Sequence, residues 1–431
     1  MIFEDNYKQS YVWIWLPGAT EPVVAGKLAE TQGRIVFTYG QSYLVRKDAI
    51  PIYDHELPLK PGAHEKTWGT DSLPGCIRDS APDAWGRRVI VNKLLGVKGA
   101  DADTGALNEL TYLMESGSDR IGALDFQASP TEYRPRESGS ASLEELQHSA
   151  ELVEKGVQLT PDLAQALQHG TSIGGARPKA LITDDSHKYI AKFSSSTDLY
   201  NMIKAEYVAM RLAHLCGLDV AHIGLTQAAG RDVLLIERFD RQCMRSDDNA
   251  NDQMGWARKL MLSALTLLDL DEMTARYASY QDLAEIIRHR FLEPKKSLEE
   301  LFGRIVFNIL CGNTDDHARN HAAFWDGQAL TLTPAYDICP QMRTGGEATQ
   351  AMAITDNDKS SRLATALKAA PHYLLTPEQA GDIIESQIQT IVEHWDDVCE
   401  QAQLSDVDEN VLSERMFFNS YAFEGYENAK R

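Results

Sequence analysis

Oxygen-rich side chains are concentrated in one short stretch of the chain, residues 313–320, with the sequence Asn-Thr-Asp-Asp-His-Ala-Arg-Asn. Asp315 is followed after four intervening residues by Asn320, and a further acid, Asp337, comes downstream. Phosphoryl transfer needs a carboxylate that orients the attacking hydroxyl and accepts its proton, and hard oxygen ligands for magnesium on the phosphates. Kinase-type enzymes supply these groups in the order Asp, Asn, Asp. The spacing therefore predicts Asp315 as the general base and Asn320 and Asp337 as magnesium ligands.

The same stretch allows other interpretations. Asp-Asp-His runs are often solvated turns or helix caps, and we expect Asp316 to cap or solvate this loop. His317 completes the pattern Asp-x-His-x-x-Asn, which is also the form found in phosphoinositide kinases. His317 and His321 could instead contribute to a metal site, because imidazole is a common metal ligand. The sequence upstream of this stretch is needed to distinguish these interpretations.

A candidate phosphate-binding turn lies upstream at 171–179, with the sequence Thr-Ser-Ile-Gly-Gly-Ala-Arg-Pro-Lys. Gly174 and Gly175 would let backbone amides approach an anion closely, and Lys179 adds a positive charge. The pattern is neither a P-loop nor a Gly-x-Gly-x-x-Gly loop, so an ordinary turn before a strand remains an alternative. Lys192 lies near the end of an apolar strand, where its charge needs an anion such as an ATP phosphate unless it snorkels to water.

Acidic and aromatic positions complete the candidate nucleotide site. Glu206, on the helix that follows, is a candidate ion-pair partner for Lys192 in the manner of kinases. Glu237 and Phe239 end a buried strand just before a polar segment, where a hinge would offer backbone groups to adenine. A plain strand end would give the same pattern. Taken together, these patterns are stronger evidence for a nucleotide site than any one of them alone. They occur along the chain in the order that one ATP site requires: the glycine-rich turn, the strand lysine, the helix glutamate, the hinge, and then the Asp–Asn–Asp set.

These residues are distributed over a strand-rich half and a helical half. Alternation of β-branched and aromatic residues predicts strands at 11–16, 34–39, 179–183, 188–193 and 232–239. Apolar periodicity and capping signals predict helices at 82–95, 107–115, 142–156, from 160 onward, 198–216, 258–268, 280–291, 297–311 and from 377 onward. Ser142, Ser297 and Thr376 are the predicted cap residues, and 321–333 is predicted to form a hairpin. The polar segment 242–253 is expected to be a flexible connection between the halves.

The length of 431 residues, 43% of them hydrophobic, is enough for two or three domains. We expect a β-rich N-terminal subdomain at 1–130 and a nucleotide-binding lobe with the glycine-rich turn at 142–241. A helical lobe with the catalytic loop and the metal-binding Asp is expected at 255–431.

The net charge of −21 argues against direct nucleic-acid binding by the whole chain and suits a basic protein partner. The six cysteines show no Cys-x-x-Cys spacing, so we expect reduced thiols and neither a disulfide framework nor a zinc site. The chain shows no evident signal peptide and no apolar run of membrane-spanning length. A cytoplasmic location without membrane association is therefore expected.

With these residues assembled, the chain resembles the HipA family of bacterial toxin kinases over nearly its full length. The motifs that carry the resemblance are 171–179, 235–241 (Leu-Ile-Glu-Arg-Phe-Asp-Arg), 313–320, 332–337 (Leu-Thr-Pro-Ala-Tyr-Asp) and, in the N-terminal part, 79–88 (Asp-Ser-Ala-Pro-Asp-Ala-Trp-Gly-Arg-Arg). The segment 256–268 departs from the best-known branch of the family, which bears on the substrate and on the mode of antitoxin contact.

The resemblance implies an α+β, two-lobed protein-kinase-like fold of the phosphoinositide-kinase type, with a strand-rich N-terminal half and an all-helical C-terminal lobe. It implies a serine/threonine kinase that uses ATP and Mg²⁺. In known members the substrate is an aminoacyl-tRNA synthetase, whose modification stalls translation and leads to growth arrest or persistence. It also implies a helix-turn-helix antitoxin of the HipB type, through which operator DNA is reached indirectly.

Family members also autophosphorylate a serine in the glycine-rich loop, and the matching position here is Ser172. A phosphate at Ser172 would add close to two negative charges where ATP should bind, and would disfavour nucleotide. Two other functions stay open: a small-molecule or lipid kinase, and a catalytically inactive regulator that binds nucleotide. The intact set Lys192, Asp315, Asn320 and Asp337 argues against the inactive regulator.

Overall fold

The computed structural model has two compact units. Unit 1 comprises Met1–Ser196, Thr226–Leu262 and Trp325–Gln328, and unit 2 comprises Thr197–Leu225, Ser263–Phe324 and Ala329–Arg431. The structure describes residues 7–65, 73–95, 105, 107–136, 141–155, 157, 175, 177–184, 186–195, 198–244, 255–343 and 345–426. Helices and sheets are both present, as predicted, whereas the lobe layout and the division into three domains stay predictions. Within the described residues, no helix has the length and apolar character needed to span a bilayer.

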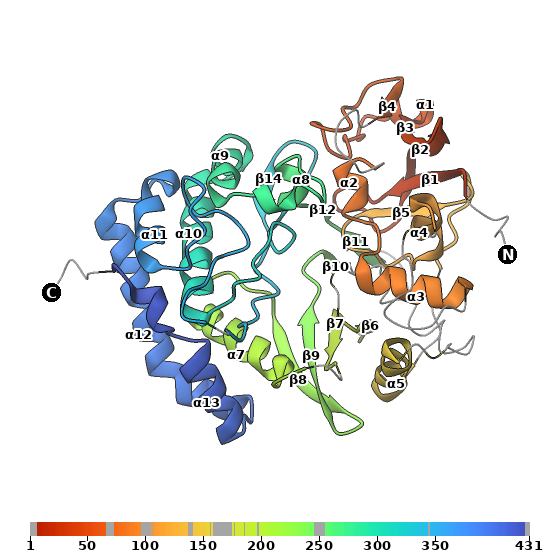
Figure 1. Ribbon diagram of the computed structural model, residues 1–431. Helices are drawn as coiled ribbons and strands as arrows, with labels where there is room; N and C mark the ends of the chain where they lie inside the picture. Colours follow the sequence, from red (N-terminus) through yellow and green to blue (C-terminus); the bar gives the residue numbers. More distant parts are fainter. Residues whose placement is uncertain are drawn as a thin grey trace. The chain divides into compact units, whose positions relative to one another are not determined.

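The first sheet of unit 1 has the strand order β4-β3-β2-β1-β5 among the described residues, and its neighbouring strands are antiparallel where their register is defined (Figure 1). Its strands are β1 (Gln9–Ile14), β2 (Val23–Thr31), β3 (Arg34–Tyr39), β4 (Ala63–Glu65) and β5 (Leu124–Gln127). The helices of this part are α1 (Gln41–Leu44), α2 (Gly75–Arg78), α3 (Ala84–Leu95), α4 (Glu109–Glu115) and α5 (Leu143–Glu154). The predicted capping box at Ser142 is confirmed, since Ser142 and Glu145 cap each other's backbone amides at the start of α5.

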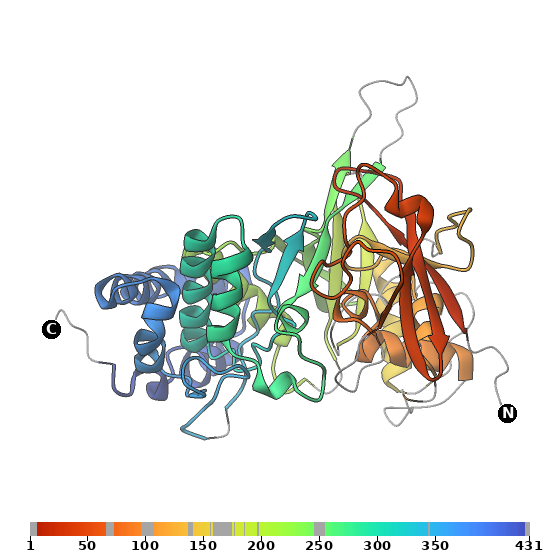
Figure 2. The same cartoon turned by 90° about the horizontal axis from the view of Figure 1, so that it is seen from above.

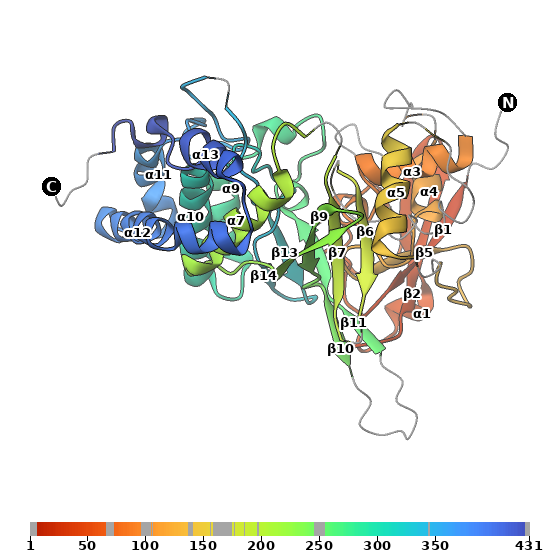
Figure 3. The same cartoon turned by 90° about the horizontal axis from the view of Figure 1, so that it is seen from below.

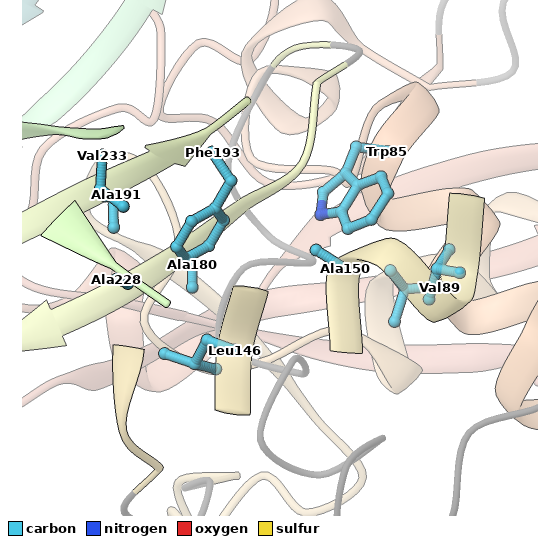
Figure 4. Close-up of a cluster of buried hydrophobic side chains, with 10 residues drawn as sticks. Trp85, Val89, Leu146, Ala150, Ala180, Ala191, Phe193, Ala228 and Val233 are labelled. Atoms are coloured by element: carbon cyan, nitrogen blue, oxygen red, sulfur yellow. The ribbon is translucent and has the colours of Figure 1, made fainter. Parts of the chain in front are cut away.

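The second sheet, which lies in unit 1 except for the first three residues of β8, has the order β6-β7-β9-β8, and Figure 3 shows β6, β7 and β9 side by side. Its strands are β6 (Lys179–Thr183), β7 (Lys188–Phe193), β8 (Ile223–Ala228) and β9 (Arg231–Glu237). One face of this sheet packs on α3 and α5, where Phe193 and Val233 meet Trp85 and Leu146 in one buried cluster (Figure 4). This core fixes which face of the sheet remains for a ligand.

Predictions for the segment that follows need correction. The expected flexible connection at 242–253 is wrong for its first three residues, which belong to β10 (Arg241–Met244), paired antiparallel with β11 (Gly255–Arg258). The rest of that connection lies outside the described residues. The expected helix at 258–268 is instead the end of β11, then β12 (Leu260–Ser263) and the short helix α8 (Ala264–Leu267). Buried Leu260 and Leu262 alternate with a half-buried residue, which is strand periodicity, and over so few residues it is easily confused with helical periodicity.

Unit 2 is built around α10, whose side chains are all buried from Leu301 to Cys311. The helices α9, α11 and α12 pack against α10, and α12 also packs against α7; Figure 2 shows the blue-green α9 and α10 beside the blue helices. The elements of unit 2 are α7 (Met202–Leu215), η2 (Ala275–Tyr277), α9 (Tyr280–Arg290), α10 (Pro294–Cys311), β13 (Ala322–Trp325), β14 (Leu330–Leu332), α11 (Leu363–Ala369), η3 (Ala370–Tyr373), α12 (Pro377–Gln401), α13 (Asp406–Arg415) and η4 (Ser420–Phe423), with the last residue of β13 in unit 1.

The cap predictions for unit 2 have mixed outcomes. Thr376 forms the predicted capping box with Gln379 at the start of α12. The predicted cap at Ser297 is wrong, because α10 already begins at Pro294 and Ser297 lies inside its first turn. Proline is favoured at the first position of a helix, because an N–H group at that position has no acceptor within the helix and its absence costs nothing. Pro294 therefore sets the start of α10. The predicted hairpin is confirmed by β13 and β14.

Candidate active site

Lys179 and Lys192 lie on one face of the second sheet of unit 1. They stand directly opposite each other in the antiparallel register of β6 and β7, so both side chains project to the same side. Lys179 is 3% exposed and Lys192 is 8% exposed. Like charges in opposed positions repel each other, and burial makes each charge more costly. An anion with several negative oxygens, such as a polyphosphate, would offset this repulsion, and the phosphate-binding role of the two lysines stays a prediction.

The opposite face of the same strands carries the hydrophobic core. Ala180 and Ala191, the sequence neighbours of the two lysines, are also directly opposed, and they belong to the buried cluster that includes Trp85 and Leu146 (Figure 4). Since side chains alternate between faces along a strand, the lysine face is the one turned away from this cluster. The sheet thus separates a packing face from a candidate nucleotide face.

Gly175 is the glycine of the predicted turn at 171–179 that the structure describes, along with Arg177, Pro178 and Lys179. Its φ of 108° lies in a region that side-chain-bearing residues rarely adopt, and a Cβ at this position would overlap the Lys179 ammonium group. The carbonyl of Gly175 accepts a hydrogen bond of 3.4 Å from the amide of Trp85 at the start of α3. Ser172 and Gly174 lie outside the described residues, as does the helix predicted from Thr160.

The predicted hinge follows β9 directly. Glu237 and Phe239 are partly buried, and Glu237 Oε1 lies 4.0 Å from His187 Nε2. Between them, Arg238 is buried and its amide donates to the carbonyl of Lys188 at 2.7 Å. The contacts of Glu237 and Phe239 with adenine stay a prediction. Glu206, the predicted partner of Lys192, is buried on α7 of unit 2, and their pairing also stays a prediction.

The predicted catalytic loop follows α10 in unit 2. The helix ends at Gly312, whose φ of 72° is left-handed, and a Cβ there would lie 2.7 Å from the carbonyl oxygen of Met416. The loop is then closed by short-range hydrogen bonds. The amide of His317 donates to the carbonyl of Asp315 at 2.9 Å, and Nδ2 of Asn320 donates to the same carbonyl at 3.2 Å. The structure therefore brings Asp315 and Asn320 together as the sequence predicts.

Asp315 keeps its side chain exposed to solvent at the surface of the loop. Partial desolvation raises its pKa, His317 opposes this increase, and the negative charges of Asp337 and Asp316 add to it. An effect of Asp337 on this pKa agrees with the prediction that both carboxylates act in one site, and their roles stay predictions. A raised pKa also makes Asp315 a stronger proton acceptor once it is ionised.

Asp337 has a left-handed backbone, with φ of 59°. Such a conformation is uncommon for residues other than glycine, and it occurs preferentially at functional sites. The preceding residues are firmly held: the amide of Ala335 donates to the carbonyl of Asp219 at 2.7 Å, and the hydroxyl of Tyr336 donates to the carbonyl of Arg319 at 2.7 Å. The second of these bonds links the Asp337 segment directly to the catalytic loop.

Asp316 corrects one prediction, since it is 3% exposed and does not solvate the loop. Its Oδ2 accepts hydrogen bonds of 2.8 Å from Asn308 Nδ2 and 2.8 Å from His321 Nε2, and another from the hydroxyl of Tyr280. Burial would raise the pKa of Asp316, but His321 and Tyr280 outweigh it and hold the pKa below its usual value. Asp316 fixes the loop from inside, next to the predicted base.

The residues of the loop fit magnesium better than a histidine-bound metal. His321 Nε2 is hydrogen-bonded to Asp316, and no cluster of three or more His, Cys, Asp or Glu side chains placed to hold a metal occurs in the described part of the chain. The bond from Asn320 Nδ2 to the Asp315 carbonyl leaves the Asn320 amide oxygen as a potential ligand. Together with the carboxylate of Asp337 it supplies the hard oxygen donors that magnesium prefers.

Comparison with known protein families assigns the chain as a whole. The HipA-like C-terminal domain matches residues 171–395, and the HipA N-terminal domain matches residues 16–127. The chain belongs to the HipA family. The resemblance predicted from the sequence is therefore confirmed, and the C-terminal match begins at the glycine-rich turn and includes both lysines and the catalytic loop.

Related proteins extend this assignment. Y4mE of Sinorhizobium fredii (strain NBRC 101917 / NGR234), which carries a provisional kinase name, is 25% identical over 353 residues, or 75% of this chain and 76% of Y4mE. The serine/threonine-protein kinase toxin HipA of Shewanella oneidensis is 24% identical over 186 residues, or 40% of this chain and 41% of the toxin. The solved complex of Shewanella oneidensis HipA with HipB and operator DNA matches with a TM-score of 0.67 at 17% identity, over 93% of this chain and 94% of the other. This last match shows a shared fold.

Proposed function

We propose that this chain is a serine/threonine protein kinase of the HipA type that uses ATP and Mg²⁺. Two bonds in unit 2 carry the proposal: Asn320 donates to the carbonyl of Asp315, and Tyr336, next to Asp337, donates to the carbonyl of Arg319 in the same loop. These two segments would then supply the base and the oxygen ligands. The opposed Lys179 and Lys192 in unit 1 support it, since they supply positive charge for the phosphates. Relatives that are named as kinases are consistent with this function.

In the proposed reaction, a serine or threonine hydroxyl oxygen of the substrate attacks the γ-phosphorus of ATP. The new O–P bond forms as the bond from the γ-phosphorus to the β–γ bridging oxygen breaks, and ADP leaves. Asp315 orients the hydroxyl and accepts its proton. Lys179 and Lys192 hold phosphate oxygens, and Asn320 and Asp337 would hold Mg²⁺, which neutralises charge on the phosphates.

The proposed macromolecular partners follow from the family. We propose a protein substrate of the aminoacyl-tRNA synthetase type, so that phosphorylation inhibits translation and growth. A helix-turn-helix antitoxin of the HipB type is the proposed neutralising partner, as HipB accompanies HipA and operator DNA in the Shewanella oneidensis complex. The net charge of −21 supports a basic antitoxin as the intermediary, because this chain would itself repel the phosphate backbone of DNA.

The test is intact-mass spectrometry of dephosphorylated full-length chain after incubation with ATP and Mg²⁺, beside Asp315→Ala. The wild type should gain a phosphate that maps to Ser172, whereas Asp315→Ala should gain none while still binding ATP. Equal phosphorylation of both proteins would show that Asp315 is not the base. Label from γ-labelled ATP that appears in an organic extract of a whole-cell lysate, and not in protein, would favour a lipid kinase. Bound ATP with no transfer to Ser172 or to lysate proteins would favour an inactive regulator.

A further inference from the structure

Cationic side chains of Lys188, Arg238 and Arg241 converge on Asp119 in unit 1. The Asp119 carboxylate lies 2.5 Å from Lys188 Nζ, 2.9 Å from a terminal nitrogen of Arg238 and 2.9 Å from one of Arg241. Asp240 is the second carboxylate of this cluster, at 2.8 Å from Arg238 and 2.9 Å from Arg241. Burial would raise the pKa of Asp119, but the surrounding cations outweigh it and hold the pKa well below its usual value. Asp119 is therefore ionised at neutral pH.

The backbone around Asp119 is bound to the same arginines. We name residues Ser116–Gly122, which connect α4 to β5, the clamp loop. Arg238 donates to the carbonyl of Arg120 at 2.6 Å, and Arg241 donates to the carbonyl of Gly122 at 2.9 Å. Guanidinium groups present several N–H donors in a fixed plane, so each arginine can bind carboxylate and carbonyl oxygens at once. The clamp loop is thereby attached to the segment that follows β9.

Further contacts strengthen this attachment. The amide of Gly122 donates to the carboxylate of Asp240 at 2.8 Å, so the bonding runs in both directions. On the neighbouring strand β11, Arg258 donates to the carbonyl of Ser118 at 2.8 Å. The guanidinium carbon of Arg258 also lies 3.4 Å from the ring centroid of Trp15 on the N-terminal side. The clamp loop is held from several sides by charged groups.

The position of these arginines gives the clamp loop a role in nucleotide binding. Arg238 lies between Glu237 and Phe239, whose backbone groups are the proposed contacts for adenine. Backbone groups bind a ligand well only when they are already held in the binding geometry. We propose that Asp119 is a positioning residue for ATP, which acts through Arg238 to hold the hinge in its adenine-binding position. This inference rests on the proposed function, and it makes the HipA N-terminal domain a supporting part of the nucleotide site.

The test separates KM for ATP from kcat in phosphate transfer by the full-length chain. Asp119→Asn keeps the size of the side chain and removes its charge. The hinge should then be held less firmly, while the catalytic loop belongs to unit 2 and keeps its own residues and its own internal hydrogen bonds. KM for ATP should rise about tenfold, and kcat should change by less than about twofold. Direct titration with a fluorescent ATP analogue should give the same loss of affinity.

Asp125→Asn is the matched control. Asp125 is fully buried in the N-terminal domain, whereas the Asp119 side chain is 13% exposed, and the described ion-pair partners of Asp125 are Arg120, at 2.9 Å, and Arg136, at 2.8 Å. Loss of this charge should lower stability in a similar way while both carboxylate partners of Arg238, Asp119 and Asp240, stay in place. KM for ATP should therefore stay within about twofold of the wild type. An equal rise of KM in both variants would indicate general damage to the domain and would overturn the inference.

A second variant covers the case in which Asp119→Asn does not fold. The double variant Asp119→Asn/Lys188→Met removes one charge of each sign from the cluster, so its net charge equals that of the wild type. It should show the same rise in KM for ATP. Either variant, folded and with the KM of the wild type, would overturn the positioning role. A wild-type chain that binds no ATP would contradict the proposed function itself, so the two failures can be told apart.

Discussion

A carboxylate with little exposure to solvent fixes one loop in each unit, Asp119 in unit 1 and Asp316 in unit 2, but the two units do this differently. In unit 1, Asp119 is held by cations from distant parts of the chain. In unit 2, Asp316 accepts hydrogen bonds from Tyr280, Asn308 and His321, and it lies next to the predicted base. The clamp loop thus depends on balanced buried charges, whereas the catalytic loop depends mainly on satisfied hydrogen bonds.

The difference has energetic consequences. Removal of one member of a buried ion pair leaves its partner charged and uncompensated, which is strongly destabilising. A change from carboxylate to amide removes the charge of a hydrogen-bond acceptor but keeps one oxygen atom. It lowers the free energy of unfolding less, because the donors around that oxygen can still form their hydrogen bonds. We therefore expect an isosteric Asp-to-Asn change to lower the free energy of unfolding strongly in the clamp loop and only slightly in the catalytic loop.

The largest effect is expected for Asp119→Asn. The variant leaves Arg238 and Arg241 to share Asp240, so the free energy of unfolding should fall by about 3–5 kcal/mol. Denaturant unfolding, followed by circular dichroism, measures this change. A loss below about 1 kcal/mol would show that the buried charges of unit 1 are not tightly balanced.

A smaller effect is expected at the entry to the catalytic loop, for Gly312→Ala. Its left-handed φ alone should cost about 1–2 kcal/mol, and the close approach to the Met416 carbonyl should add to that cost. Gly217→Ala is the matched control, since Gly217 has φ of 84° and a Cβ added there would meet no atom within 4 Å. Equal losses in thermal stability would mean that the Met416 contact relaxes freely.

Asp316→Asn should be milder than either. The Asn oxygen can replace Oδ2 as acceptor for Tyr280, Asn308 and His321, so we expect a loss of about 1–2 kcal/mol. The same denaturant experiment gives the value. A loss as large as that of Asp119→Asn would remove the proposed distinction between the two loops.

The smallest effect is a pH dependence of the difference between wild type and Asp119→Asn. The folded-state pKa of Asp119 is depressed, so its stabilisation is complete above its unfolded pKa of about 3.9 and is lost as pH falls through the folded pKa. The difference in unfolding free energy should be constant from pH 7 to about pH 5 and should shrink in more acidic buffer. A difference that grew on acidification would mean that Asp119 is not stabilised as a carboxylate.

The contrast between the two loops also explains what the sequence could predict. Asp316 is only eight residues from Asn308 and five from His321, so the catalytic loop, with Asp315 and Asn320, and the partners that fix it lie in one short stretch of sequence. Asp119 and Arg238 are 119 residues apart, and only the fold brings them together. The charged positions of the motif at 235–241 are evident in the sequence, but nothing local indicates their partner.

Local competition accounts for the other differences between prediction and structure. Asp316 follows a pattern common in solvated turns, and its burial results from packing against Tyr280 on a helix about forty residues earlier. The segment 258–268 has enough apolar residues for a helix, but Arg258 pairs with β10 as the end of β11, and Leu260–Ser263 form the strand β12. The sequence identifies Lys179 and Lys192 as separate candidates. Only the register of β6 and β7 shows that the two side chains lie on the same face of the sheet.

The central claim is that unit 1 holds the nucleotide and unit 2 carries out the transfer. It is tested most directly by measuring ATP affinity and the rate of phosphate transfer on the wild type, Lys192→Met and Asp315→Asn. Lys192→Met should lose ATP affinity by about 10- to 100-fold. Asp315→Asn should bind ATP within about twofold of the wild type and transfer phosphate about 10²–10⁴-fold more slowly. Near-normal transfer by Asp315→Asn would contradict the account.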